Sequence, residues 1–290
     1  MRWSDRGQSQ NVEDDRGSSG GRFSGGGARL GLGGMLVLLV LSLVFKRDFF
    51  SLVGAGGAGG DGTGQVTSGP VQSTPEEEKL AHFVGFVLDT TQAFWAQELP
   101  TLGAQYHLAT LVLFRDGIQS ACGFAETASG PFYCPGDQKV YIDLQFYEEL
   151  KTRFHAPGEF AEAYVIAHEV GHHVQNLLGI SARVDRARSR ASERQSNALS
   201  VRLELQADCF AGVWGYNANR TRHILQNGDI EAALNAATQI GDDTLQRGAG
   251  RTVNPDSFTH GSSAQRVEWF KKGINTGDIA QCDTFKAAGL

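Results

Sequence analysis

One five-residue motif in this 290-residue chain could bind a metal ion and activate water. His168-Glu169-Val170-Gly171-His172 is an H-E-x-x-H pattern. Residues four apart lie on one face of an α-helix, so His168 and His172 can direct imidazole nitrogens at one zinc ion, about 2.0–2.1 Å away. Glu169 lies beside them and can take a proton from a water on the metal, whose pKa zinc lowers to about 7. The motif predicts a hydrolytic zinc site, although so short a pattern also arises by chance on ordinary helices.

The residues around the motif supply the helix that it requires. Pro157-Gly158 precedes an acidic first turn at Glu159, and Gly179 is a typical helix end. The metzincin continuation is absent, because position 175 is Gln and position 178 is Leu. The third ligand must therefore come from another part of the chain.

A glutamate on a later predicted helix is the best candidate for that ligand. A catalytic zinc site takes three protein ligands and leaves the fourth position open. Glu204 and Asp208 lie four residues apart, so Glu204 can bind the ion while Asp208 accepts the free N–H of a ligand histidine. The alternatives are that this pair forms a solvated helix face, or that Glu193 or Asp185 is the ligand. Small residues favour a close approach of this helix to the motif helix: Ala207, Ala211 and Gly212.

Composition separates a globular part from the first 70 residues. The chain is 41% hydrophobic and carries a net charge of −6, which argues against nucleic acid as a partner. Of the 37 glycines, many lie before residue 70. We therefore predict a disordered tail over 1–29, a transmembrane anchor over 30–53, a flexible linker over 54–74 and a catalytic domain over 75–290.

The anchor prediction depends on an apolar run. Leu30 to Phe45 is uncharged, and the run becomes long enough to span a bilayer if Lys46 and Arg47 reach the interface. A cleaved signal peptide or a buried core helix are the alternatives. Arginines precede the run and no basic residue follows Arg47 until Lys79, which favours an inside N-terminus and an outside domain.

Four cysteines indicate two disulfides in an oxidising compartment, with four free thiols as the alternative. The favoured pairs are Cys122–Cys134, around a short loop, and Cys209–Cys282, which ties the C-terminus to the core. The remaining pattern predicts strands at 108–114 and 139–144 and helices at 75–99, 144–153, 159–178, a long one ending near 217, 229–241 and 262–273. This is an α+β fold, mostly helical with a small sheet.

Three segments together resemble the bacterial putative neutral zinc metallopeptidase family. They are residues 168–175, 204–212 and 258–266, and the Arg-Trp start and Asn11-Val12-Glu13-Asp14 extend the likeness over almost the whole chain. The family is similar in plan to gluzincin peptidases, and the resemblance implies a zincin-like hydrolase holding one zinc ion. In that plan a later histidine stabilises the oxyanion. His260 before a predicted helix resembles it, with a capping or packing histidine as the alternative.

Taken together, these features predict a single-pass membrane-anchored zinc metallopeptidase that cleaves peptides or proteins outside the bacterial cytoplasmic membrane, on the periplasmic side. Its catalytic residues are Glu169 and His260. The alternative is a membrane-tethered zinc-binding interaction protein without turnover, against which the intact Glu169 counts.

His173 is expected to be packed or exposed rather than a ligand. Other transition metals also suit imidazole ligands. If strand 139–144 is an edge strand, Tyr141 and Asp143 could line the cleft and pair with a peptide.

Overall fold

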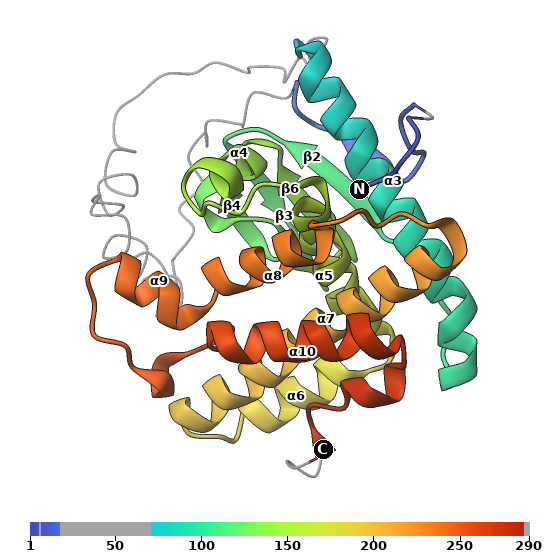
Figure 1. Ribbon diagram of the computed structural model, residues 1–290. Helices are drawn as coiled ribbons and strands as arrows, with labels where there is room; N and C mark the ends of the chain where they lie inside the picture. Colours follow the sequence, from blue (N-terminus) through green and yellow to red (C-terminus); the bar gives the residue numbers. More distant parts are fainter. Residues whose placement is uncertain (6, 18–70, 287–290) are drawn as a thin grey trace, which may run out of the picture.

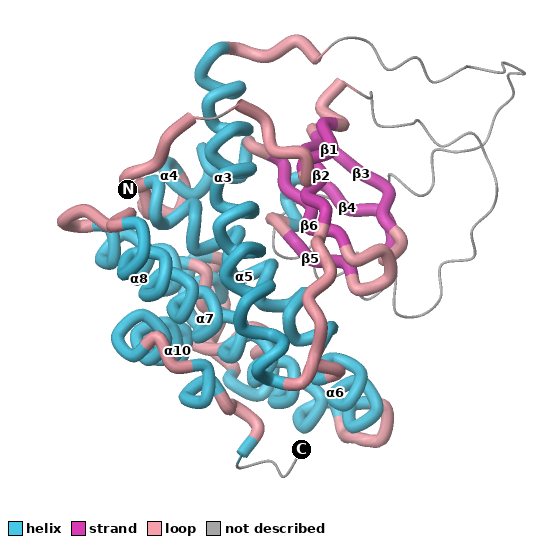
Figure 2. Tube along the Cα trace, turned by 90° about the vertical axis from the view of Figure 1, so that its right-hand side faces the viewer, coloured by secondary structure: helices cyan, strands magenta, loops and turns pink. Residues whose placement is uncertain are grey.

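The computed structural model describes residues 1–5, 7–17 and 71–286. The predicted anchor at 30–53 lies outside these residues, and so does the linker at 54–74 except for its last four positions. Helices form most of the described chain, and a small sheet packs at one side of them (Figures 1 and 2). The fold is α+β, as the sequence predicts. Within the described residues, no helix has both the length and the apolar composition needed to cross a bilayer.

The main sheet has the strand order β1-β2-β6-β5. Its strands are β1 (Val12–Asp14), β2 (Thr110–Phe114), β5 (Phe132–Cys134) and β6 (Lys139–Asp143). The β1–β2 and β2–β6 pairs are parallel, and β5 runs antiparallel to β6. A separate hairpin joins β3 (Gly117–Ser120) to β4 (Gly123–Glu126). Because β6 lies between β2 and β5, its backbone cannot pair with a substrate peptide, and the condition for the pairing considered above is not met.

The six predicted helices are present, although the long one ends at Arg222 rather than near 217. Two short helices, Ile180–Arg188 and Asp242–Gly248, were not predicted. The helices are α3 (Pro75–Glu98), α4 (Gln145–Thr152), α5 (Glu159–Leu177), α6 (Ile180–Arg188), α7 (Glu193–Arg222), α8 (Asp229–Gln239), α9 (Asp242–Gly248) and α10 (Ser263–Thr276). Thr74 caps α3, because its Oγ1 accepts a hydrogen bond from Glu77 N at 3.2 Å. Ser192 begins α7 with a capping box that includes Gln195, which separates α6 from α7.

The two faces of β6 belong to different clusters of buried residues. Val140 and Ile142 pack in the main core with the helices, whereas Tyr141 belongs to a second cluster and stacks on Phe132 at 4.8 Å. The side chains of β6 therefore alternate between its two faces. Tyr141 and Asp143 have structural partners. The Tyr141 hydroxyl donates to Asp137, and Asp143 accepts from the backbone N–H groups of Asp116 and Gln145.

Residues 1–5 and 7–17 are part of the domain, which contradicts the predicted disordered tail for these positions of 1–29. Strand β1 pairs with β2 in the sheet. Trp3 packs edge-on against Phe83 of α3, and its indole N–H donates to Glu159 Oε1 at 3.1 Å. A polar composition suggested disorder, but long-range pairing gives this segment the partners that its sequence lacks locally.

Buried Arg16 fixes the end of the N-terminal segment. Its guanidinium contacts Asp14 at 2.6 Å and Glu78 at 2.8 Å, and Nη1 lies 3.3 Å from Glu77. Glu77 and Glu78 belong to the first turn of α3. The chain therefore leaves the described structure after residue 17 close to the point where α3 begins.

Two disulfides stabilise the fold. Cys122 bonds Cys134 across 12 residues, and Cys209 of α7 bonds Cys282 across 73 residues. Both predicted pairings are confirmed. The second bond fixes the C-terminal segment against α7, in the part of the helix that carries Asp208.

Candidate metal centre

The structure brings His168, His172 and Glu204 together at the junction of α5 and α7. The two imidazole Nε2 atoms lie 3.1 Å apart. Glu204 Oε2 is 3.2 Å from His168 Nε2, and Glu204 Oε1 is 3.4 Å from His172 Nε2. Ligand atoms that sit about 2.0–2.1 Å from a tetrahedral ion lie roughly 3.3 Å apart. The three side chains therefore fit a zinc ion in both chemistry and spacing.

Close contact between the two helices makes this spacing possible. A Cβ atom on Gly171 would lie 3.1 Å from Ala207 Cα and 3.2 Å from its carbonyl oxygen. Glycine and alanine at these two positions let the backbones approach, so that Glu204 and the motif histidines meet. Gly212, in contrast, faces α10, where a Cβ would lie 2.4 Å from the Phe270 carbonyl oxygen. Its predicted role in the contact with α5 is wrong.

Asp208 holds His168 from the side away from the ligand cluster. Its Oδ1 lies 2.9 Å from His168 Nδ1, so the imidazole can donate there and leave Nε2 free for a metal. Arg266 of α10 binds the same carboxylate through two nitrogens, each at 2.9 Å. The hydroxyl of Tyr164 donates to Asp208 Oδ1 at 2.5 Å. Asp208 is fully buried, and these donors satisfy its charge.

Arg266 and Tyr164 were not predicted from the sequence to contact the metal centre. Arg266 lies 58 residues after Asp208 on a different helix. The only indication in the sequence was that Arg266 closes the third segment of the family resemblance. Tyr164 does lie four residues before His168, at a helical spacing that could have identified it.

Glu169 is buried beside the ligand cluster without belonging to it. Burial raises the pKa of its carboxyl group, and the nearby His168 and His172 partly oppose that rise. A raised pKa suits a group that takes a proton at neutral pH and then releases it. Its position next to the ligands suits the predicted proton-transfer role.

The ligand groups carry strongly shifted pKa values in the absence of an ion. Burial would lower the pKa of His168, but Asp208 and Glu204 outweigh it and raise the pKa to about 10. Burial would also lower the pKa of His172, but Glu204 outweighs that effect and the pKa is raised. Burial would raise the pKa of Glu204, yet His172 and His168 hold it well below its usual value. Metal binding at neutral pH must therefore displace a proton from His168.

His260 lies close enough to the ligand cluster to influence it electrostatically. Its charge lowers the pKa of Glu204, after the larger effects of burial and the two motif histidines. The His260 side chain is 52% exposed, and its Nδ1 lies 3.3 Å from Asp242 Oδ1. The other oxygen of Asp242 accepts backbone N–H bonds from residues 259, 260 and 261 at 2.7–2.9 Å. Asp242, which the sequence reasoning missed, fixes the loop that presents His260.

The rival ligands do not join the cluster. Asp185 makes an ion pair with Arg188 at 3.7 Å, and Glu193 lies exposed in the first turn of α7. His173 is buried, which agrees with the prediction that it is packed or exposed rather than a ligand. Its Nε2 lies 2.7 Å from the His107 carbonyl oxygen, and its Nδ1 lies 3.0 Å from the Tyr133 hydroxyl. It has a structural role on the side of α5 that faces β5.

Solvent reaches the ligand cluster on one side. The side chains of His172 and Glu204 are 19% and 18% exposed, whereas His168 is nearly buried.

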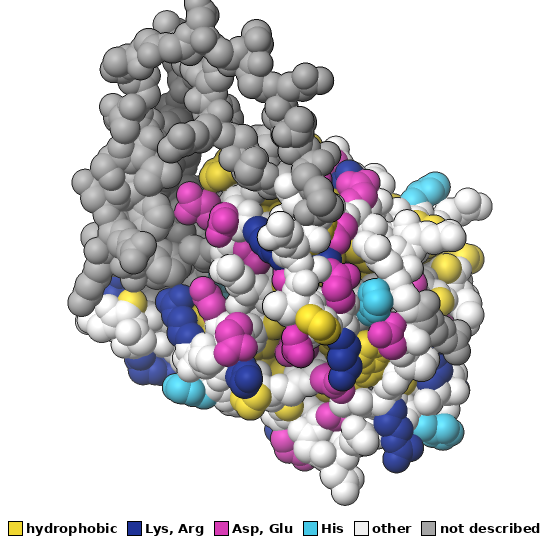
Figure 3. All heavy atoms as spheres, turned by 90° about the horizontal axis from the view of Figure 1, so that it is seen from above, with side chains coloured by type: hydrophobic (Ala, Val, Ile, Leu, Met, Phe, Trp, Pro, Cys, Tyr) yellow, Lys and Arg dark blue, Asp and Glu magenta, His cyan; other side chains and the backbone are white. Residues whose placement is uncertain are grey.

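A hollow of about 700 Å³ runs beside the His260 loop, along α7 and α10, with walls that include Val201, Phe258 and Trp269. On the face drawn in Figure 3, acidic and basic side chains are interspersed rather than gathered by sign.

The fold and the site define an α+β protein in which two packed helices bring together three side chains that could hold a metal ion. The chain belongs to the putative neutral zinc metallopeptidase family, whose sequence profile matches residues 1–285. It is 49% identical to the uncharacterized protein YpfJ of Escherichia coli K12, over 98% of this chain and 99% of the relative. An uncharacterized protein of Mycobacterium tuberculosis is 42% identical over 70% of this chain and 69% of its own length. No solved structure matches. The family's description implies zinc as the metal.

Proposed function

We propose that this protein is a zinc-dependent peptidase, and the geometry of His168, His172 and Glu204 is the observation that supports it most. The donor set of two imidazoles and one carboxylate leaves room for a fourth position, which is typical of catalytic rather than structural zinc sites. Zinc at such a site supplies a water of pKa about 7 and polarises a carbonyl group.

The protein's own side chains account for the remaining steps of peptide hydrolysis. Glu169 takes the proton of the attacking water and delivers it to the leaving nitrogen. Asp208 keeps the Nδ1 proton on His168, which directs Nε2 toward the ligand cluster. His260, whose Nδ1 lies 3.3 Å from Asp242, is the residue that we propose donates a hydrogen bond to the oxygen that gains charge in the transition state.

Hydrolysis of an unfolded protein by the purified full-length chain tests this function directly. Casein should be cleaved after zinc is added and left intact after a chelator removes the ion. Zinc bound without any cleavage would instead favour a zinc-binding interaction protein.

Replacing His260 with phenylalanine should lower turnover and leave the zinc content unchanged. Loss of one oxyanion donor costs about 10²–10³ in turnover, and the exposure of His260 suggests the lower end. The measurement is the rate of peptide cleavage together with metal analysis. His107→Phe, at another exposed histidine, is the matched control. Turnover equal to that of the wild type would remove the role of His260.

We also propose that the protein acts outside the bacterial cytoplasmic membrane and is attached to that membrane through residues 30–53. The two disulfides and the apolar composition of Leu30–Phe45 support this location. A single crossing by that segment would leave residues 1–17 and the catalytic domain on opposite sides. Since β1 pairs with β2, we propose that both parts lie on the outer side, which revises both the predicted single crossing and the predicted inside N-terminus.

Labelling of introduced cysteines can test this arrangement. Gln8 and Lys271 are exposed at opposite ends of the sequence. Gln8→Cys and Lys271→Cys should both react with a membrane-impermeant maleimide on intact spheroplasts. Labelling of Lys271→Cys alone would indicate a single crossing, and labelling of neither would place the domain in the cytoplasm.

A further inference from the structure

A chain of two buried glutamine side chains leads away from the metal ligand His172. His172 Nδ1 lies 2.9 Å from Gln175 Oε1. Gln175 Nε2 donates to the Leu203 carbonyl oxygen at 2.7 Å and to Gln206 Oε1 at 3.1 Å. Gln206 Nε2 donates in turn to the Cys282 carbonyl oxygen at 3.0 Å.

The backbone carbonyl groups determine the direction of every bond in this chain. A carbonyl oxygen only accepts, so the atoms of Gln175 and Gln206 that face Leu203 and Cys282 must be the amide nitrogens. The oxygen of Gln175 then faces His172 and requires a proton on Nδ1. The neutral imidazole therefore presents the lone pair of Nε2 to the ligand cluster, which is the state that binds a metal.

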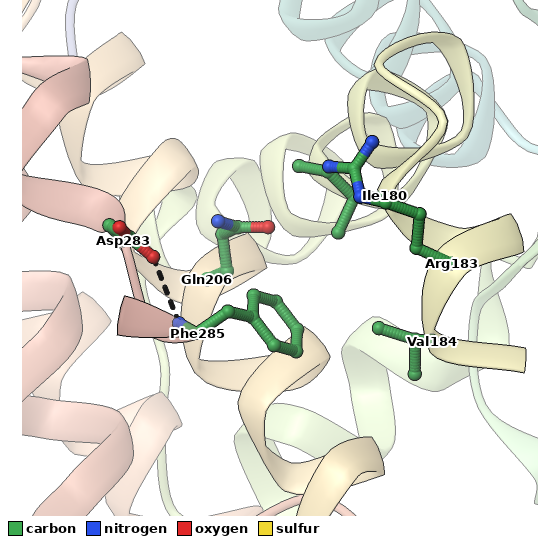
Figure 4. A pocket seen from close by; sticks show the side chains of 6 residues that line it. All are labelled: Ile180, Arg183, Val184, Gln206, Asp283 and Phe285. Atoms are coloured by element: carbon green, nitrogen blue, oxygen red, sulfur yellow. Dashed lines mark hydrogen bonds between the residues drawn. The ribbon is translucent and has the colours of Figure 1, made fainter. Parts of the chain in front are cut away.

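The outer end of the chain is held by the C-terminal segment. Cys282 is bonded to Cys209, three residues after Gln206 on α7. Thr284 makes two hydrogen bonds with Arg202. Its carbonyl oxygen accepts from Arg202 Nη1 at 2.7 Å, and its hydroxyl donates to the Arg202 carbonyl oxygen at 2.8 Å. Gln206 also forms part of the wall of a pocket of about 250 Å³, between residues of α6 and the residues Asp283 and Phe285 that follow Cys282 (Figure 4).

We propose that Gln175 and Gln206 are positioning residues for His172, and that the Cys209–Cys282 disulfide helps to hold the far end of their chain. His168 and His172 then have different supports, a charged one through Asp208 and a neutral one through the glutamines. The proposal rests on the proposed zinc-dependent function. It extends that function by linking an oxidised disulfide to the retention of the metal.

Zinc affinity, measured by competition with a chromophoric chelator, tests the first part of the proposal. Gln175→Leu should weaken zinc binding by about 10–100-fold, the usual loss when the outer hydrogen-bond partner of a ligand is removed. Gln206→Leu should weaken it less, because Gln175 keeps its bond to Leu203. Gln92→Leu is the matched control, since Gln92 is equally buried and bonded to Tyr106 and Ala109.

A spectroscopic measurement separates positioning from general stability. In the zinc-loaded wild type, nitrogen-15 NMR of the imidazoles should show a protected Nδ1 proton on His172. That proton should exchange rapidly with solvent in Gln175→Leu and stay protected in Gln92→Leu. An unchanged His172 signal, or equal zinc losses in the two variants, would overturn the role of the glutamines.

The disulfide has its own matched comparison. The double variant Cys209→Ser/Cys282→Ser should bind zinc more weakly than the wild type, whereas Cys122→Ser/Cys134→Ser should not. Equal affinities in the two double variants would overturn the link to the disulfide. Should the first double variant fail to fold, Gln206→Leu still tests the chain with the disulfide intact. A wild-type chain that binds no zinc would overturn the proposed function itself, whereas equal affinity in wild type and Gln175→Leu would overturn this inference alone.

Discussion

Replacing Glu169 with glutamine should abolish most peptide hydrolysis while zinc remains bound. The two side chains have nearly the same size, so the buried position beside the ligands stays filled. The amide cannot take a proton from water, and loss of a general base costs about 10²–10⁴ in rate. Glu169 does not belong to the ligand cluster, so the metal content should match that of the wild type.

Glu162 provides a matched control on the same helix. Burial, with a contribution from Glu159, raises the pKa of its carboxyl group to about 7. Glu162→Gln therefore also neutralises a shifted carboxyl group of α5, but away from the ligands. Casein or peptide cleavage by the three purified full-length proteins, with zinc determined for each, makes the comparison. Equal rates for wild type and Glu169→Gln would end the peptidase proposal, and equal losses in both variants would point to a general effect on α5.

The parts of this site that the sequence predicted share one property, a local spacing. His168 and His172, and also Glu204 and Asp208, lie four residues apart on a helix, and each spacing determines a shared face whatever the rest of the fold does. The disulfides were predictable because few pairings of four cysteines exist. The helix ranges followed from capping residues and apolar periodicity.

The parts that the sequence did not predict depend on contacts between distant segments. Strand β1 has three residues and becomes a strand only through pairing with β2, about a hundred residues later. Nothing in the sequence assigned a structural role to Gln175, because its partner Gln206 lies 31 residues away. A buried polar side chain acquires its role from such partners, and a single sequence does not specify them.

Arg266 shows most clearly how such a distant contact supports the site, and its replacement should have the largest effect on stability. In Arg266→Met the carboxylate of Asp208 loses both guanidinium bonds and stays fully buried. Removing one partner of a buried ion pair costs about 3–5 kcal/mol. The Tyr164 hydroxyl and His168 still contact Asp208, so the lower end of that range is expected.

The double variant Asp208→Asn/Arg266→Met distinguishes this electrostatic cost from lost packing. Asparagine carries no charge, so the double variant should recover much of the unfolding free energy that Arg266→Met loses, as measured by urea denaturation of the metal-free chain. Zinc binding should not recover to the same degree, because a neutral amide supports His168 less well than a carboxylate. If the double variant is no more stable than Arg266→Met, then packing by the arginine stem, rather than its charge on Asp208, is what joins α10 to the metal centre.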